Sequence, residues 1–193
     1  MKQIKKLSMI LMLFMLGASW SGNLAAANNK QTPSSTQQLA ESLLTDITQA
    51  TWITEGKSPH VVYVFFDANC PYCHQLYLNT RPWIKQGKLE LRWIPVGTLT
   101  TTSKGKAAAM LQAKNPLAAF HKNQEQYDQG GGIEEDLPST EVEKQLSTNA
   151  ALLARTPFGS VPTLVLRAND GTPVLAVGSP PKDKLKSLLD NVK

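Results

Sequence analysis

A run of β-branched and aromatic residues at positions 61–66 predicts a buried strand. The run ends at Asp67-Ala68-Asn69, whose short polar side chains favour a turn or a helix cap. Apolar positions then recur at helical spacing, although Pro82 should kink or shorten this helix, which ends near residues 86–88. Residues 89–97 first alternate between apolar and polar and then become wholly apolar. Together these patterns predict two core strands joined by a helix, a βαβ unit.

The C-terminal part of the chain predicts a hairpin followed by a helix. Residues 161–167 favour a third strand that is entered through a proline, and Asn169-Asp170-Gly171 is typical of a hairpin turn. Residues 173–177 supply the antiparallel partner strand. Residues 182–192 place leucines on one face of a last helix.

The remaining segments predict mostly helix. Residues 98–156 favour several helices, the last opened by a capping box at Thr140-Glu141-Val142-Glu143. Residues 36–50 form an amphipathic helix, followed by a short strand at 52–54 and a turn at 55–59. We expect the apolar face of the 36–50 helix to pack on the domain, and an exposed linker helix or a dimer contact is the alternative. The whole order is βαβ, helical insertion, ββα, which is an α/β fold.

The first 27 residues have the pattern of a secretory signal peptide. Lys2, Lys5 and Lys6 precede an apolar segment that is too short to span a bilayer, and Ala25-Ala26-Ala27 supplies small residues for cleavage. An uncleaved anchor is the alternative. We therefore expect export to the periplasm, cleavage of the signal peptide, and a soluble mature protein. In that protein, a polar tail and the amphipathic helix at 28–50 precede one folded domain at 51–193.

The charge of the chain changes this picture little. The formal net charge is +5, but the lysines of the predicted signal peptide contribute much of it, so the rest of the chain is close to neutral. We find no basic patch that would indicate binding to nucleic acid. The chain length suits one domain with an ordinary core.

Two cysteines, Cys70 and Cys73, are the only ones in the chain and follow the first core strand. Pro71 between them suits the first position of a helix. Residues three apart at a helix start lie about 5–6 Å apart, which a disulfide can span. The helix N-terminus favours a thiolate at Cys70, which makes it the attacking thiol, and Cys73 is placed to resolve a mixed disulfide. A structural disulfide is the alternative, although so short a loop makes a poor crosslink.

These features together resemble the thioredoxin fold and, more narrowly, the catalytic domain of the DsbC/DsbG periplasmic disulfide isomerases. The resemblance covers nearly all of the chain after the predicted signal peptide. It is carried by the stretches Trp52-Ile53-Thr54-Glu55-Gly56-Lys57, Val62-Tyr63-Val64-Phe65, Asp67, Cys70-Pro71-Tyr72-Cys73, Arg81-Pro82-Trp83, the run from Gly87-Lys88 to Val96-Gly97, and Ser139-Thr140-Glu141.

The resemblance implies roles for particular residues. Cys70 would be the nucleophile and Cys73 the resolving thiol, with Pro71 and Tyr72 as the dipeptide between them. Pro162 would be a cis-proline, and the backbone of Val161 would bind an extended substrate strand opposite the cysteine pair. No cofactor is implied.

The resemblance also implies partners. The substrates would be exported proteins with disulfides or oxidised cysteines, and a DsbD-like membrane reductase would restore the dithiol. A DsbA-like disulfide-forming oxidant, recharged by a DsbB-like oxidase, is the main alternative. A redox-dependent chaperone or assembly factor for a secretion or conjugation system is another.

Three departures from the isomerase pattern change these expectations. Too few residues precede the first strand to form the N-terminal dimerisation domain, so we expect a monomer rather than a DsbC-type dimer. Val161 stands where the isomerases have threonine, as in DsbA-type oxidants. Val64 stands where thioredoxin has a buried carboxylate, so that proton acceptor is missing, and Asp67 is expected to be a cap.

His74 leaves one further alternative open. Cys70 to His74 also match the C-x-x-C-H sequence of c-type haem attachment, with His74 and Met110 as axial ligands. Against haem, the pair follows a strand, whereas cytochromes c are helical. In the redox interpretation we expect His74 to be a solvated surface residue, and the alternative is that its partial positive charge stabilises the Cys70 thiolate. We expect no metal site, because His60 in a loop and His121 on a polar helix face lack ligand spacing.

Overall fold

The computed structural model describes residues 33–129 and 131–193. The predicted signal peptide lies outside these residues, as does most of the polar tail that follows it. Residues 33–193 form one compact unit. In the part of the chain so described, no helix is long and apolar enough to cross a membrane.

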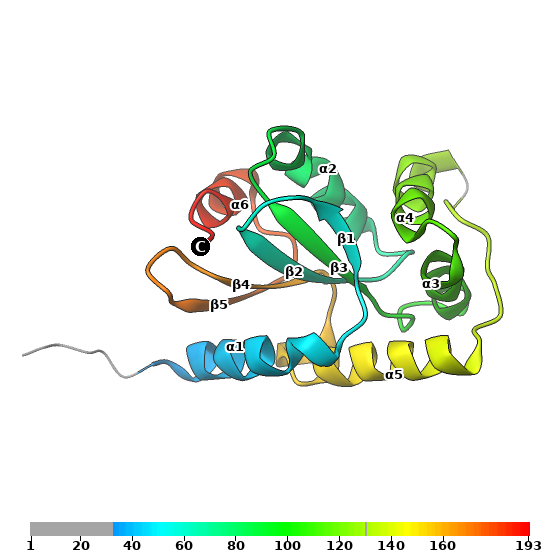
Figure 1. Cartoon of the computed structure of the whole chain (residues 1–193), viewed down its shortest axis with the longest axis horizontal. Helices are drawn as coiled ribbons and strands as arrows, with labels where there is room; N and C mark the ends of the chain where they lie inside the picture. Colours follow the sequence, from blue (N-terminus) through cyan, green and yellow to red (C-terminus); the bar gives the residue numbers. More distant parts are fainter. Residues whose placement is uncertain (1–32, 130) are drawn as a thin grey trace, which may run out of the picture. The chain divides into compact units, whose positions relative to one another are not determined.

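A mixed five-stranded sheet runs through this unit in the order β1-β3-β2-β4-β5 (Figure 1). β2 and β3 are parallel, and every other neighbouring pair is antiparallel. The βαβ unit and the C-terminal hairpin are therefore confirmed. The strands are β1 (Ile53–Gly56), β2 (Val61–Phe66), β3 (Glu90–Pro95), β4 (Thr163–Arg167) and β5 (Pro173–Val177).

Helices cover both faces of the sheet (Figure 1). On one face, α1, the 3-10 turn after it and α5 bury Phe65, Ile94 and Val165. On the other face, α2, α4 and α6 bury the alternate side chains, including Phe66 and Trp93. The helices are α1 (Ser35–Asp46), α2 (Pro71–Lys85), α3 (Ser103–Gln112), α4 (Pro116–Glu125), α5 (Thr140–Ala154) and α6 (Lys182–Leu189).

The amphipathic helix at the start of the domain packs on its own sheet. Leu43 is fully buried in one core cluster with Phe65 and Val165, and Arg167 of β4 forms an ion pair with Glu41 at 2.8 Å. The expectation that this helix packs is confirmed over the linker alternative. The helix is shorter than predicted, because a 3-10 turn at Ile47–Gln49 replaces its last α-helical turn.

Several predicted boundaries were wrong in detail. The end of α2 is not among them, since the helix continues to Lys85, next to the predicted end at residues 86–88. Pro82 lies inside it without shortening it, because a proline removes only one hydrogen bond and the following residues Trp83 and Ile84 pack on the core. Glu55 and Gly56, expected in a turn, belong to β1, where Gly56 pairs with Glu90. The cap of α5 is Ser139 rather than Thr140, because the Ser139 hydroxyl accepts the Val142 N–H.

Candidate active site

The two cysteines lie at the junction between β2 and α2. Cys70 is the N-cap of α2 and Pro71 occupies its first turn, as predicted. The Cys73 N–H donates a hydrogen bond to the Cys70 sulfur at 3.3 Å. Both are free cysteines and both are buried, with 3% of Cys70 and 1% of Cys73 exposed. Both cysteines are therefore almost fully enclosed at the start of α2.

Hydrogen bonding makes the two thiols unequal. The hydrogen bond from the Cys73 thiol is the largest of the effects that lower the pKa of Cys70 to about 7. The N–H groups of Cys73 and Tyr72 also lower this pKa, whereas burial raises it. Burial raises the pKa of Cys73 well above its usual value, and the hydrogen bond to Cys70 and the neighbouring negative charges add to this. Above about pH 7 the favoured state is thus a Cys70 thiolate beside a protonated Cys73.

A loop from the other half of the sheet faces Cys70. The Val161–Pro162 peptide bond is cis, as the resemblance implies. The Cys70 sulfur lies 3.6 Å from the Val161 carbonyl oxygen, and the protonated thiol donates to it. Tyr72, between the cysteines, is 66% exposed. The site is therefore a sulfur flanked by an exposed aromatic ring and by the backbone of an extended loop.

Asp67 is not the cap that the sequence predicted. Cys70 takes that position, and the Asp67 carboxylate is fully buried. It accepts hydrogen bonds from Asn69 N–H and the Ser103 hydroxyl on one oxygen and from the Thr98 and Leu99 N–H groups on the other. With four donors on its oxygens, the carboxylate ties the turn before Cys70 to the entry of the helical insertion.

Asn69, immediately before Cys70, is held by residues that the sequence analysis did not identify. Lys106, only 9% exposed, donates to the Asn69 side-chain oxygen at 2.8 Å and also to the Gly131 carbonyl. The Tyr127 hydroxyl donates to the Asn69 carbonyl at 2.9 Å. In the sequence, the feature that could have indicated a buried lysine is the position of Lys106 next to the apolar stretch of α3.

His74 is not the solvated surface residue that we expected. Its side chain is 12% exposed and stacks on Tyr127, with ring centroids 4.5 Å apart. Nδ1 lies 3.2 Å from the Gln124 side-chain oxygen, and Nε2 lies 3.7 Å from the Asp128 carboxylate. Both ring nitrogens face protein groups, because the insertion folds over the start of α2. This arrangement disfavours the haem alternative, in which a ring nitrogen of His74 would be an axial ligand. No cluster of three or more metal-ligating side chains occurs among residues 33–129 and 131–193.

His121 belongs to a buried ionic cluster rather than to a polar helix face. Its Nε2 lies 2.7 Å from Glu55, whose carboxylate is 2% exposed and also binds Arg81 and the Trp93 indole N–H. Burial raises the pKa of Glu55, but the bonds and charge of Arg81, with Trp93 and His121, outweigh it and hold the pKa below its usual value. The cluster therefore joins α2, the helix that begins at the cysteines, to β1, β3 and α4.

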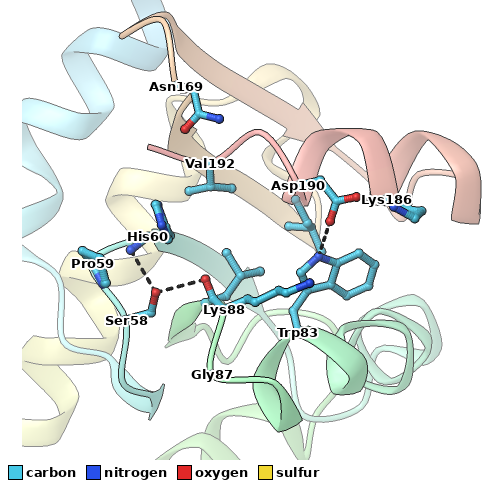
Figure 2. Close-up of a pocket in the computed structure, with 12 residues that line it drawn as sticks. Ser58, Pro59, His60, Trp83, Gly87, Lys88, Asn169, Lys186, Asp190 and Val192 are labelled. Carbon is cyan, nitrogen blue, oxygen red and sulfur yellow. Dashed lines mark hydrogen bonds and ion pairs between the residues drawn. The ribbon is translucent and has the colours of Figure 1, made fainter.

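A separate pocket lies at the other end of α2 (Figure 2). It has a volume of about 610 Å³ and is lined by the loop before β2 and the C-terminal parts of α2 and α6. The Trp83 indole N–H donates to Asp190 at 2.7 Å across it (Figure 2). α2 has 15 residues and is therefore about 22 Å long, so this pocket is not part of the cysteine site.

The hydrogen bonds around the two thiols predict how the reactivity of Cys70 depends on pH. Because only the thiolate reacts, alkylation of the reduced protein by iodoacetamide should rise with pH to half its maximum near pH 7, the pKa of Cys70. Replacing Cys73 with alanine removes the largest cause of the lowered pKa, so the midpoint should move upward in Cys73→Ala. An unchanged midpoint in this variant would contradict the assigned hydrogen bond.

A cysteine pair that caps a helix after a central strand and faces a cis-proline loop defines a thioredoxin-fold protein with a C-x-x-C site. A family model described as thioredoxin-like domain matches residues 47–193. The chain belongs to this family.

Two relatives share more of the sequence. The thiol:disulfide interchange protein DsbG of Pseudomonas aeruginosa is 34% identical over 157 residues, which cover 78% of this chain and 60% of that protein. DsbG of Escherichia coli is 36% identical over 149 residues, which cover 74% of this chain and 58% of that protein. The chain thus spans about three fifths of the length of these relatives.

A solved structure shares the fold at much lower identity. The catalytic domain of Proteus mirabilis ScsC has a TM-score of 0.62 and 16% identity, over 78% of this chain and 96% of that one. The predicted α/β thioredoxin-like fold is confirmed.

Proposed function

We propose that this protein is a periplasmic thiol–disulfide oxidoreductase of the DsbG type, which reduces or isomerises disulfides in exported proteins. One observation carries the proposal: Cys70 caps α2, has a pKa lowered to about 7, and lies 3.6 Å from the carbonyl of the cis-proline loop. A nucleophilic sulfur and a backbone edge for an extended chain are thereby adjacent. The similarity to the two DsbG proteins supports the same assignment.

The proposed cycle needs only the two cysteines. The Cys70 thiolate attacks one sulfur of a substrate disulfide, and the other sulfur leaves as a thiolate. Cys73 gives up its proton and attacks Cys70, which releases the second substrate sulfur and leaves a Cys70–Cys73 disulfide. Two electrons pass to the substrate. A DsbD-like membrane reductase would return them to the protein.

The Cys70 pKa favours this direction over the DsbA-like alternative. A pKa of about 7 resembles that of thioredoxin, whereas the strongly oxidising DsbA has a pKa of about 3.5 at its nucleophile. A thiolate that is stabilised less strongly makes the dithiol a better electron donor. Val161 is the residue that the chain shares with DsbA-type oxidants, but it contacts Cys70 through its backbone carbonyl. Threonine has the same carbonyl, so this contact does not favour the DsbA-like alternative.

The reduction potential of the Cys70–Cys73 pair tests the proposal. Equilibration with glutathione buffers should give a potential clearly more negative than about −120 mV, the value of DsbA. The reduced protein should also reduce insulin. A potential close to that of DsbA would favour disulfide formation, coupled to a DsbB-like oxidase, instead.

Export and a monomeric state are further parts of the proposal. The signal-peptide pattern of residues 1–27 supports export to the periplasm. The packing of α1 on β4 and β5 of its own sheet supports a catalytic unit that acts as a monomer. Light scattering after gel filtration would test the monomer. A chaperone that does not depend on redox chemistry would keep its activity when both cysteines are replaced.

A further inference from the structure

Phe158 combines two unfavourable features. Its φ of +68° lies in the left-handed region, and it is the one residue other than glycine with a positive φ within residues 33–129 and 131–193. Its side chain is 94% exposed, so packing does not compensate for this conformation. A large aromatic residue at such an angle is uncommon, and conformations of this kind concentrate at functional sites.

The segment around Phe158 is held in place by hydrogen bonds. The Gly159 N–H donates to the Thr156 carbonyl at 3.1 Å, and the Thr163 hydroxyl donates to the Ser160 carbonyl at 2.7 Å. The exposed ring therefore stands on an ordered turn, the 3-10 segment Pro157–Gly159, and not on a loose one.

This turn leads directly into the loop that contacts Cys70. Phe158 is three residues before Val161, whose carbonyl contacts Cys70. Three residues of extended chain span about 10 Å at most. A polypeptide bound at Cys70 along the cis-proline loop would therefore bring a side chain two or three residues from its cysteine next to Phe158.

We infer that Phe158 is a specificity residue that binds an apolar side chain of an extended substrate, about two or three residues from the reacting cysteine. This inference rests on the proposed thiol–disulfide function. Tyr72, between the two cysteines in the chain and 66% exposed, is a second aromatic side chain available to such a substrate. The preferred substrates are thus unfolded or extended segments with a leucine or an aromatic residue near the cysteine.

A pair of short synthetic peptides tests the inference. Each carries one central cysteine in a mixed disulfide with glutathione, and the residues two and three positions away are leucine in one peptide and serine in the other. The reduced protein converts its Cys70–Cys73 dithiol to a disulfide and releases one peptide thiol and one glutathione. We expect the leucine peptide to react about tenfold faster, as burial of part of a leucine side chain allows.

Substitutions at Phe158 separate recognition from folding. Phe158→Asn should reduce the leucine-to-serine rate ratio to near one without lowering the melting temperature, because asparagine tolerates positive φ. Phe158→Tyr keeps the ring and should keep the ratio. Leu137→Asn is the matched control, because Leu137 is also highly exposed (87%) but lies beside Gln112 at the far end of α3.

The outcomes distinguish the inference from the proposed function. Equal rates for both peptides in the wild type, or an unchanged ratio in Phe158→Asn, would overturn the inference and leave the thiol chemistry intact. No reaction of the wild type with either peptide or with oxidised glutathione would overturn both.

Discussion

Replacing Cys70 with serine is expected to reduce insulin reduction to the rate of a protein-free control. A serine hydroxyl remains protonated near neutral pH, whereas the pKa of the Cys70 thiol is about 7. Cys73 should not substitute for it, because burial raises the pKa of Cys73 well above the usual value. The assay follows precipitation of the insulin B chain with dithiothreitol as electron source. Substantial activity in Cys70→Ser would show that the nucleophile is misassigned.

Cys73→Ala is the matched variant for this experiment. It keeps the attacking sulfur and the cis-proline loop but removes the thiol that releases the substrate. The first step should therefore proceed and the mixed disulfide with insulin should accumulate, visible as a larger species on a non-reducing gel. The double variant Cys70→Ser/Cys73→Ala should form no such species. Together the three proteins assign attack to Cys70 and release to Cys73.

Replacing Glu55 with leucine is expected to give the largest loss of stability among single substitutions in the ionic cluster. The change leaves the Arg81 guanidinium and the buried Trp93 indole N–H without their acceptor. Removing one partner of a buried ion pair costs about 3–5 kcal/mol. For a domain of this size that lowers the melting temperature by about 6–20 °C. Thermal unfolding at pH 7 measures it.

Two controls define the source of this loss. Glu143→Gln removes an exposed ion pair with Lys104 and should cost under about 1 kcal/mol. In the folded wild type, the pKa of Glu55 lies below its usual value. The contribution of the Glu55 carboxylate to stability is therefore complete above the pKa of the unfolded state, and it is lost as the pH falls through the pKa of the folded state. Glu55→Leu should therefore lack the part of acid destabilisation that begins below about pH 4.5. Equal stability of wild type and Glu55→Leu at pH 7 would contradict the role of the cluster.

The strands and their order could be predicted because each carries its own local pattern. Val61–Phe66 is a continuous apolar run, as suits a central strand covered on both faces, and Pro173–Val177 follows a turn sequence that defines a hairpin. The two cysteines could be assigned because their spacing and the preceding strand are also local. The cis bond at Pro162 came only from the family resemblance, since most X–Pro bonds are trans.

The polar surroundings of the cysteines could not be predicted. Asn69 binds Lys106 and Tyr127, which lie 37 and 58 residues away along the chain, and Glu55 binds His121 across 66 residues. Such contacts depend on where the helical insertion folds, and no periodicity records that. For the same reason His74 was expected in solvent, although Tyr127 of the insertion covers its ring.

Cys70 is the cap of α2 and, in the proposed function, also the nucleophile, so its chemistry is linked to the order of the helix. A thiolate is a strong acceptor for the Cys73 N–H, whereas a sulfur engaged in a disulfide is a weak one. Each turnover therefore removes and then restores the cap on the first turn of the helix. Amide hydrogen exchange at Cys73 should therefore follow the oxidation state, so the oxidised and the reduced protein should differ in backbone mobility at the start of α2 as well as in the bond between the cysteines.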